Sequence, residues 1–166
     1  MKNLKAFQDF LDQMIKVCSG RQAEFYKAMK DDLKDCELVS VKNLFSEEEI
    51  AYMRTLIAKK ECYKNAAQIA IYLSNPDRNI EYVEGRAMVA GFPVEHAWNK
   101  VDDKYFDATF ELLLGYDVTK ETYALLREYK VAELMECLER EQCYSEFYPI
   151  LKYKTLFSTE SRRGGL

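Results

Sequence analysis

Residues 79–112 contain three strand-like runs joined by short turns, and this pattern constrains the fold more than any other feature of the chain. Residues 79–91 are rich in β-branched and aromatic residues and end at a glycine. Residues 94–101 alternate, and residues 104–112 follow a short polar loop. Strands that lie this close in sequence pair in antiparallel fashion. We therefore predict an antiparallel meander of at least three strands.

Helical periodicity precedes this meander. Apolar residues recur at steps of three and four over residues 4–18 and 62–73, and residues 22–34 also form a helical stretch. Ser46, followed three residues later by Glu49, forms a capping-box pattern and predicts a helix start there. The chain before the meander is thus expected to be helical.

Helical patterns return after the meander. Residues 123–142 have strong helix propensity, and Thr119 is a plausible N-cap for that helix. Residues 143–157 favour either a short helix or an edge strand broken by Pro149. The order of helices, strands and helices predicts an α+β fold.

The length of 166 residues fits a single domain. Within it we expect a helical N-terminal part at 1–45 and a core at 46–115. A C-terminal helical part at 116–157 and a flexible tail at 158–166 complete the predicted organisation.

Composition excludes several classes of function. A net charge of −4 and a pI near 5.2 argue against a nucleic-acid-binding protein. No apolar run approaches the ~18 residues of a membrane span, and the N-terminus lacks a signal peptide, so we expect a cytoplasmic protein. Five cysteines with no CxxC pair and a single histidine do not suit a zinc site, and neither a metal nor a cofactor is expected. The oligomeric state is left open.

Three residues in the predicted core have the types and the order of a thiol-based catalytic triad. Cys62 begins a predicted helix, where free N–H groups and the helix dipole favour a thiolate. His96 lies on the second predicted strand and Asp107 on the third. A hairpin turning near residues 102 and 103 pairs position 96 with a residue near 109, which places Asp107 diagonally across from His96. The carboxylate is then expected to orient the imidazole, which takes the thiol proton.

The stretches "CYKNAA", "YVEGRAMVAGFPVEHAWNKV" and "KYFDATF" resemble the transglutaminase-like branch of the papain-like cysteine enzymes. The resemblance covers roughly residues 58–112, with Tyr63 in place of the usual tryptophan and Ala108 in place of the usual proline. It implies a papain-like core in which the nucleophile's helix packs on the antiparallel sheet. It also implies a cysteine-dependent hydrolase or acyl transferase that acts on an amide, isopeptide or thioester bond of a protein or peptide.

Other interpretations of these residues stay open. The chain can be a catalytically inactive papain-like fold that serves as a protein-binding or inhibitory module, and Cys62 can be a redox-sensing thiol. Asn65 and Gln68 are candidates for an oxyanion or substrate group, although the backbone N–H of Cys62 is the favoured oxyanion donor. Trp98 is interpreted as core packing beside the triad in preference to a substrate platform.

Overall fold

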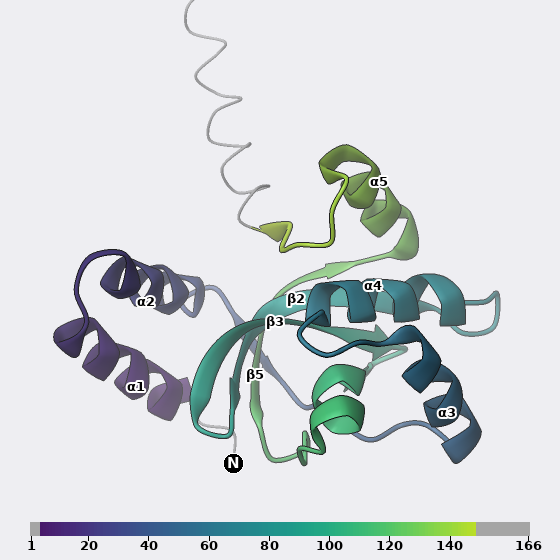
Figure 1. Ribbon diagram of the computed structural model, residues 1–166, viewed down its shortest axis with the longest axis horizontal. Coiled ribbons are helices and arrows are strands. Elements are labelled where there is room, and N and C mark those ends of the chain that lie inside the picture. The colour runs from purple at the N-terminus through teal and green to yellow at the C-terminus, as the bar shows by residue number, and fades with distance from the viewer. Residues whose placement is uncertain (1–3, 149–166) are drawn as a thin grey trace, which may run out of the picture.

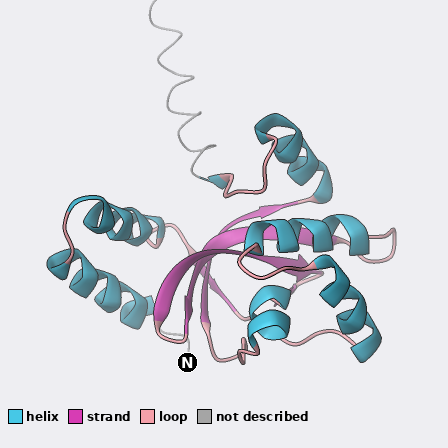
Figure 2. Ribbon diagram, viewed as in Figure 1, coloured by secondary structure: helices cyan, strands magenta, loops and turns pink. Residues whose placement is uncertain are grey.

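We describe residues 4–148 from a computed structural model of the chain; the predicted tail and most of the ambiguous stretch 143–157 lie outside these residues. Five α-helices, one short π-helix (η1) and five strands make up this part of the chain (Figures 1 and 2). In chain order they are α1 (Leu4–Val17), α2 (Gly20–Asp32), β1 (Glu37–Val39), α3 (Glu47–Leu56), α4 (Cys62–Leu73), β2 (Ile80–Val89), β3 (Phe92–Val101), β4 (Lys104–Phe106), η1 (Thr109–Leu113), β5 (Thr122–Tyr129) and α5 (Val131–Glu141).

The starts of α3 and α4, the two helices directly before the meander, were predicted from the sequence. Ser46 Oγ accepts from the backbone N–H of Glu49, and the Glu49 carboxylate accepts from the backbone N–H of Ser46. This capping box starts α3 as predicted. Helix α4 begins at Cys62, also as predicted, directly after a turn in which Lys60 has a positive φ of 64°. The thiol is therefore presented by the first residue of a helix.

The strands form one antiparallel sheet in the order β1-β5-β2-β3-β4. The predicted meander is confirmed as β2-β3-β4. The β3–β4 hairpin pairs Val101 with Lys104 and Asn99 with Phe106, which is the register that places position 96 opposite 109. His96 and Asp107, two residues of the candidate triad, are thus brought together by the hairpin that the sequence indicates.

The third predicted strand is much shorter than expected. Strand β4 ends at Phe106, Asp107 lies just beyond it, and residues 109–113 turn into the π-helix η1. The β3–β4 pairing stops because the Asp107 carboxylate accepts from the backbone N–H of Phe110, which starts a helical turn. The prediction of a strand over 104–112 was wrong beyond its first three residues.

The prediction of one helix over residues 123–142 was wrong in its first half. Residues Thr122–Tyr129 form β5, which pairs with both β2 and β1, and only Val131–Glu141 is helical. Pairing on both sides buries Tyr123, Ala124 and Tyr129, and this burial outweighs the local helix propensity. Thr119 caps no helix, because its hydroxyl donates to Asp117 in a turn.

Helices cover the sheet in two separate groups. Helix α4 packs on β2 and β3, and α3, α5 and η1 pack around α4. Helices α1 and α2 pack together at the other end of the sheet, where Phe7 and Met29 meet Ala124 of β5 (Figure 1). The part of the chain predicted as helical at 1–45 also contains the short edge strand β1. The fold is α+β, with the Cys62 helix on an antiparallel sheet.

Within residues 4–148, no helix is both long and apolar enough to cross a membrane.

Gly85 allows β2, β3 and β5 to approach one another beside the candidate site. It pairs with His96 on one side and Leu125 on the other, next to a β-bulge at Glu84. A Cβ at this position would lie 2.2 Å from the Ala124 carbonyl oxygen and 2.4 Å from Cη2 of Trp98. Backbone cannot yield at such distances without a shift of the strand.

We therefore expect Gly85→Ala to lower the free energy of unfolding by roughly 1–3 kcal/mol, the usual cost of overpacking a core. Equilibrium urea unfolding measures the change. Gly91→Asn is the matched control, because Asn tolerates the positive φ of Gly91 and no atom lies within 4 Å of its Cβ position. An unchanged midpoint for Gly85→Ala would show that the strands are not packed as described.

Candidate active site

His96 and Asp107 form a buried hydrogen-bonded pair. Nε2 of His96 lies 2.7 Å from Oδ2 of Asp107, and the two side chains are 1% and 0% exposed. Because a carboxylate only accepts hydrogen bonds, Nε2 carries a proton in this pair. The orientation leaves Nδ1 as the ring nitrogen available to another reacting group.

Two further donors hold the Asp107 carboxylate in place. The hydroxyl of Tyr123 donates to Oδ2 over 2.8 Å, and the backbone N–H of Phe110 donates to Oδ1 over 3.1 Å. With His96, these groups come from β3, β5 and η1 and meet at one carboxylate. Several donors from different elements thus satisfy the oxygens of this buried carboxylate and hold it in one orientation.

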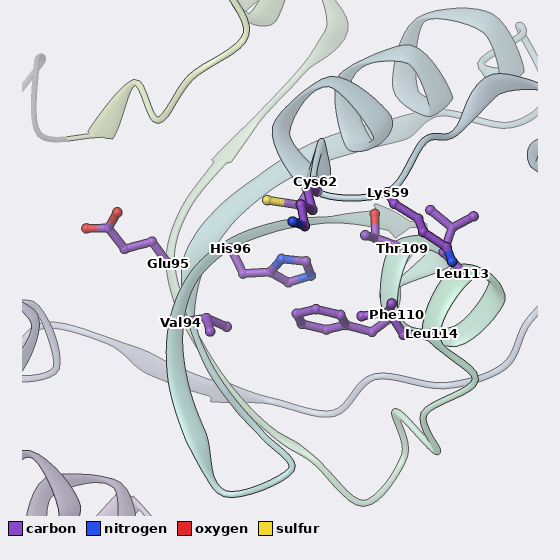
Figure 3. A pocket seen from close by; sticks show the side chains of 10 residues that line it. Lys59, Cys62, Val94, Glu95, His96, Thr109, Phe110, Leu113 and Leu114 are labelled. Atoms are coloured by element: carbon purple, nitrogen blue, oxygen red, sulfur yellow. The ribbon is translucent and has the colours of Figure 1, made fainter.

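The imidazole of His96 lies between the Phe110 ring and Cys62. The Phe110 ring stacks on it with a centroid distance of 4.0 Å and an interplanar angle of 14°. Figure 3 shows the imidazole between this ring and Cys62. Trp98 lies farther away, at 6.1 Å between ring centroids, and is 1% exposed. Trp98 packs edge-on against Tyr123 and does not line the cavity beside Cys62 that is described below. This agrees with its interpretation as core packing.

Cys62 lies beside the His96 ring at the start of α4, and its side chain is partly exposed (Figure 3). Burial lowers the pKa of His96. The charge and hydrogen bond of Asp107, together with the nearby Cys62 thiol, raise this pKa by more than burial lowers it. The result is a pKa of about 9 for His96. The ring is therefore an imidazolium at neutral pH.

Asn65 and Gln68, the two weaker candidates, lie on α4 behind the thiol. Asn65 is fully buried, and its side chain accepts from the backbone N–H of Ala58 and donates to the Ala58 carbonyl and to Thr109 Oγ1. These bonds fix the loop that leads into Cys62 and tie it to η1. Gln68 is partly exposed and does not line the cavity beside Cys62. The structure does not bring either residue to the thiol as a substrate group.

A cavity of about 370 Å³ opens beside Cys62 and His96. Its walls combine the thiol and the imidazole with mostly apolar side chains from β3 and η1. The lining residues are Lys59, Lys60, Cys62, Val94, Glu95, His96, Thr109, Phe110, Leu113 and Leu114. Its size falls within the range of small-molecule sites.

Glu84 and Arg86, neighbours of Gly85 on β2, are buried and belong to two separate networks. Glu84 accepts from the hydroxyls of Tyr82 and Tyr129 and from the backbone N–H groups of Phe147 and Tyr148. Arg86 pairs with Asp32 and Glu146 instead. These two side chains therefore anchor α2 and the segment after α5 to the sheet.

Among residues 4–148, no group of three or more histidine, cysteine, aspartate or glutamate side chains is arranged to hold a metal ion.

Tyr123 and Phe110 are the site residues that sequence reasoning missed. The sequence predicted a helix at Tyr123, and a helix there gives no reason to expect contact with Asp107. It predicted a strand at Phe110. The signal available was Asp107 itself, because an Asp side chain can accept from the backbone N–H three residues later and start a turn there.

We expect the single histidine to report the electrostatics of the site directly. In a pH titration followed by NMR, the Cε1–H resonance of His96 should show a pKa of about 9. Asp107→Asn should bring this pKa below the ordinary value of 6.5, because burial then dominates. Cys62→Ala should lower it less, and Cys143→Ala, at an exposed thiol, should leave it unchanged. A wild-type midpoint near 6.5 would contradict the buried ion pair.

Tyr123→Phe should raise the pKa of His96, because the Asp107 carboxylate loses a donor that disperses its negative charge. The free energy of unfolding should fall by roughly 1.5–3 kcal/mol, the usual cost of losing a hydrogen bond to a charged group. Tyr82→Phe is the matched control, since its buried hydroxyl donates to Glu84 over 2.9 Å. It should cost similar stability without moving the His96 titration. If the pKa of His96 is the same in Tyr123→Phe as in Tyr82→Phe, Tyr123 has no positioning role for the His96–Asp107 pair.

Comparison with known proteins leaves this geometry as the basis for assigning the site. No family model, no curated protein and no solved structure matches the chain. The buried His96–Asp107 pair beside Cys62, with Cys62 and His96 lining one cavity, is therefore the observation from which a function is inferred.

Proposed function

We propose that the protein is a cysteine-dependent hydrolase or acyl transferase with a papain-like, transglutaminase-like core and Cys62, His96 and Asp107 as its catalytic triad. The observation that carries the proposal is the buried His96–Asp107 pair beside a partly exposed thiol that begins a helix. The three groups take the places of nucleophile, base and orienting acid. The substrate bond is an amide, isopeptide or thioester bond of a protein or peptide.

In the proposed reaction the Cys62 thiolate attacks the carbonyl carbon, and the π electrons of the carbonyl move to its oxygen. The His96 imidazolium then donates its Nδ1 proton to the leaving group as the carbonyl re-forms, which yields an acyl-Cys62 thioester. Neutral His96 next takes a proton from the incoming water or amine, and this nucleophile displaces the Cys62 sulfur. Asp107 keeps its hydrogen bond to Nε2 throughout and stabilises the charged ring.

The start of α4 provides a suitable site for the oxyanion that forms during attack. Cys62 is the first residue of the helix, and the N–H groups of a first helical turn have no partner within the helix. The positive end of the helix dipole points the same way. We assign the oxyanion to the backbone N–H of Cys62, and we place no catalytic role on Asn65, whose amide holds Ala58.

Alkylation of Cys62 tests this proposal against an inactive binding module. We expect iodoacetamide to label Cys62 rapidly and at a nearly constant rate from pH 6 to pH 8, as a thiolate paired with an imidazolium does. An ordinary thiol loses roughly tenfold in rate for each pH unit below 8.5. Peptide mass spectrometry measures both cases in one sample, because the exposed Cys143 serves as the internal reference.

The matched variant is His96→Gln, which can still donate to Asp107 but cannot hold the proton of an imidazolium. Its Cys62 labelling at pH 6 should fall at least roughly tenfold, to the rate of Cys143, while the labelling of Cys143 stays the same. If Cys62 in the wild type follows the pH dependence of Cys143, the triad is not functional and the binding-module interpretation replaces it.

A further inference from the structure

We propose that the cavity beside Cys62 binds the acyl half of the substrate, and that this group is a short apolar aliphatic chain carried on a protein or peptide by an amide or thioester bond. The inference rests on the thiol chemistry proposed for Cys62 and adds the class of acyl group. A cavity of about 370 Å³ has room for roughly a dozen groups of the size of a water molecule. Such a chain fits, whereas a folded partner does not enter.

The walls of the cavity select an apolar occupant. Val94, Phe110, Leu113 and Leu114 supply apolar surface next to the reactive thiol. Thr109, a polar group of the wall, already accepts the side-chain amide of Asn65. A charged acyl group would lose part of its hydration against these apolar walls, which is costly.

The charged side chains of the cavity stay in solvent. Lys59, Lys60 and Glu95 are exposed, and Figure 3 shows the Glu95 carboxylate pointing away from the imidazole. Their charges are therefore hydrated and leave the interior of the cavity apolar. Leu114 is 47% exposed at the same cavity, so an apolar ligand would bury surface that the fold leaves in water.

One element builds both the triad and this cavity, which fixes one relative to the other. The first turn of η1 supplies the Phe110 N–H to Asp107 and the Phe110 ring to His96. The end of the same π-helix supplies Leu113 and Leu114. Nη1 of Arg54 donates to the Leu112 carbonyl over 2.6 Å and ties η1 to α3. Short π-helices occur frequently at functional sites.

Phenyl thioesters of linear acids test the inference, because only the acyl group changes along the series. Cys62 attacks the carbonyl, thiophenol leaves with the proton of His96, and the acyl group stays on Cys62 as a thioester. Water then releases the acid and restores the thiolate. Thiophenol release and the mass of the acyl-enzyme follow the two steps for acetyl, butanoyl, hexanoyl and octanoyl esters.

We expect kcat/KM to rise from acetyl to hexanoyl by roughly threefold to fourfold for each added methylene, the gain for burying one such group. Leu114→Trp should fill the cavity and abolish this rise in kcat/KM with chain length. Met135→Trp on α5 is the matched control, because Met135 has a similar exposure of 48% and does not line this cavity. Its chain-length profile should equal that of the wild type.

Two results would overturn the inference and they differ from each other. A flat chain-length profile with normal acylation of Cys62 shows that the cavity does not bind the acyl group, and it leaves the proposed triad intact. Failure of every ester to acylate Cys62 in the folded protein removes the proposed function and the inference with it. A profile that Leu114→Trp leaves unchanged also excludes this cavity as the acyl site.

Discussion

The hydrogen bond between His96 and Asp107 is the interaction on which the site depends. Both side chains are almost completely buried, so the pair is stable only if every polar atom finds a partner. The Tyr123 hydroxyl and the Phe110 N–H provide these partners. Because they lie on β5 and η1, the central sheet and the π-helix must both form before the carboxylate can be held in place.

The same requirement explains how the surrounding structure is arranged. Glu84 on β2 is a second buried carboxylate, and it is held by Tyr82 and Tyr129 in the way that Tyr123 holds Asp107. Gly85 lies between these two networks and lets Trp98 and β5 approach closely. The neighbourhood of the thiol thus contains two buried carboxylates, each held by several hydrogen bonds, and one partly exposed sulfur at the edge of an apolar cavity.

Several features followed from local sequence because their causes are local. The capping box of Ser46 and Glu49 involves two residues of one helical turn, and it was predicted correctly. The start of α4 at Cys62 was also predicted. The β3–β4 register was predicted because short hairpins leave few alternative pairings. The local sequence therefore predicted that His96 and Asp107 lie close together.

The sequence by itself determined that His96 and Asp107 lie close together, the meander that carries them and the α+β class of the fold. Only the tertiary structure decided that residues 122–129 form a strand, because the pairing of β5 with β1 and β2 lies far away in sequence. For the same reason it alone brought Tyr123 to Asp107, buried the amide of Asn65 under Thr109 and shaped the cavity with Leu113 and Leu114. These contacts join elements distant in sequence, and no local pattern encodes them.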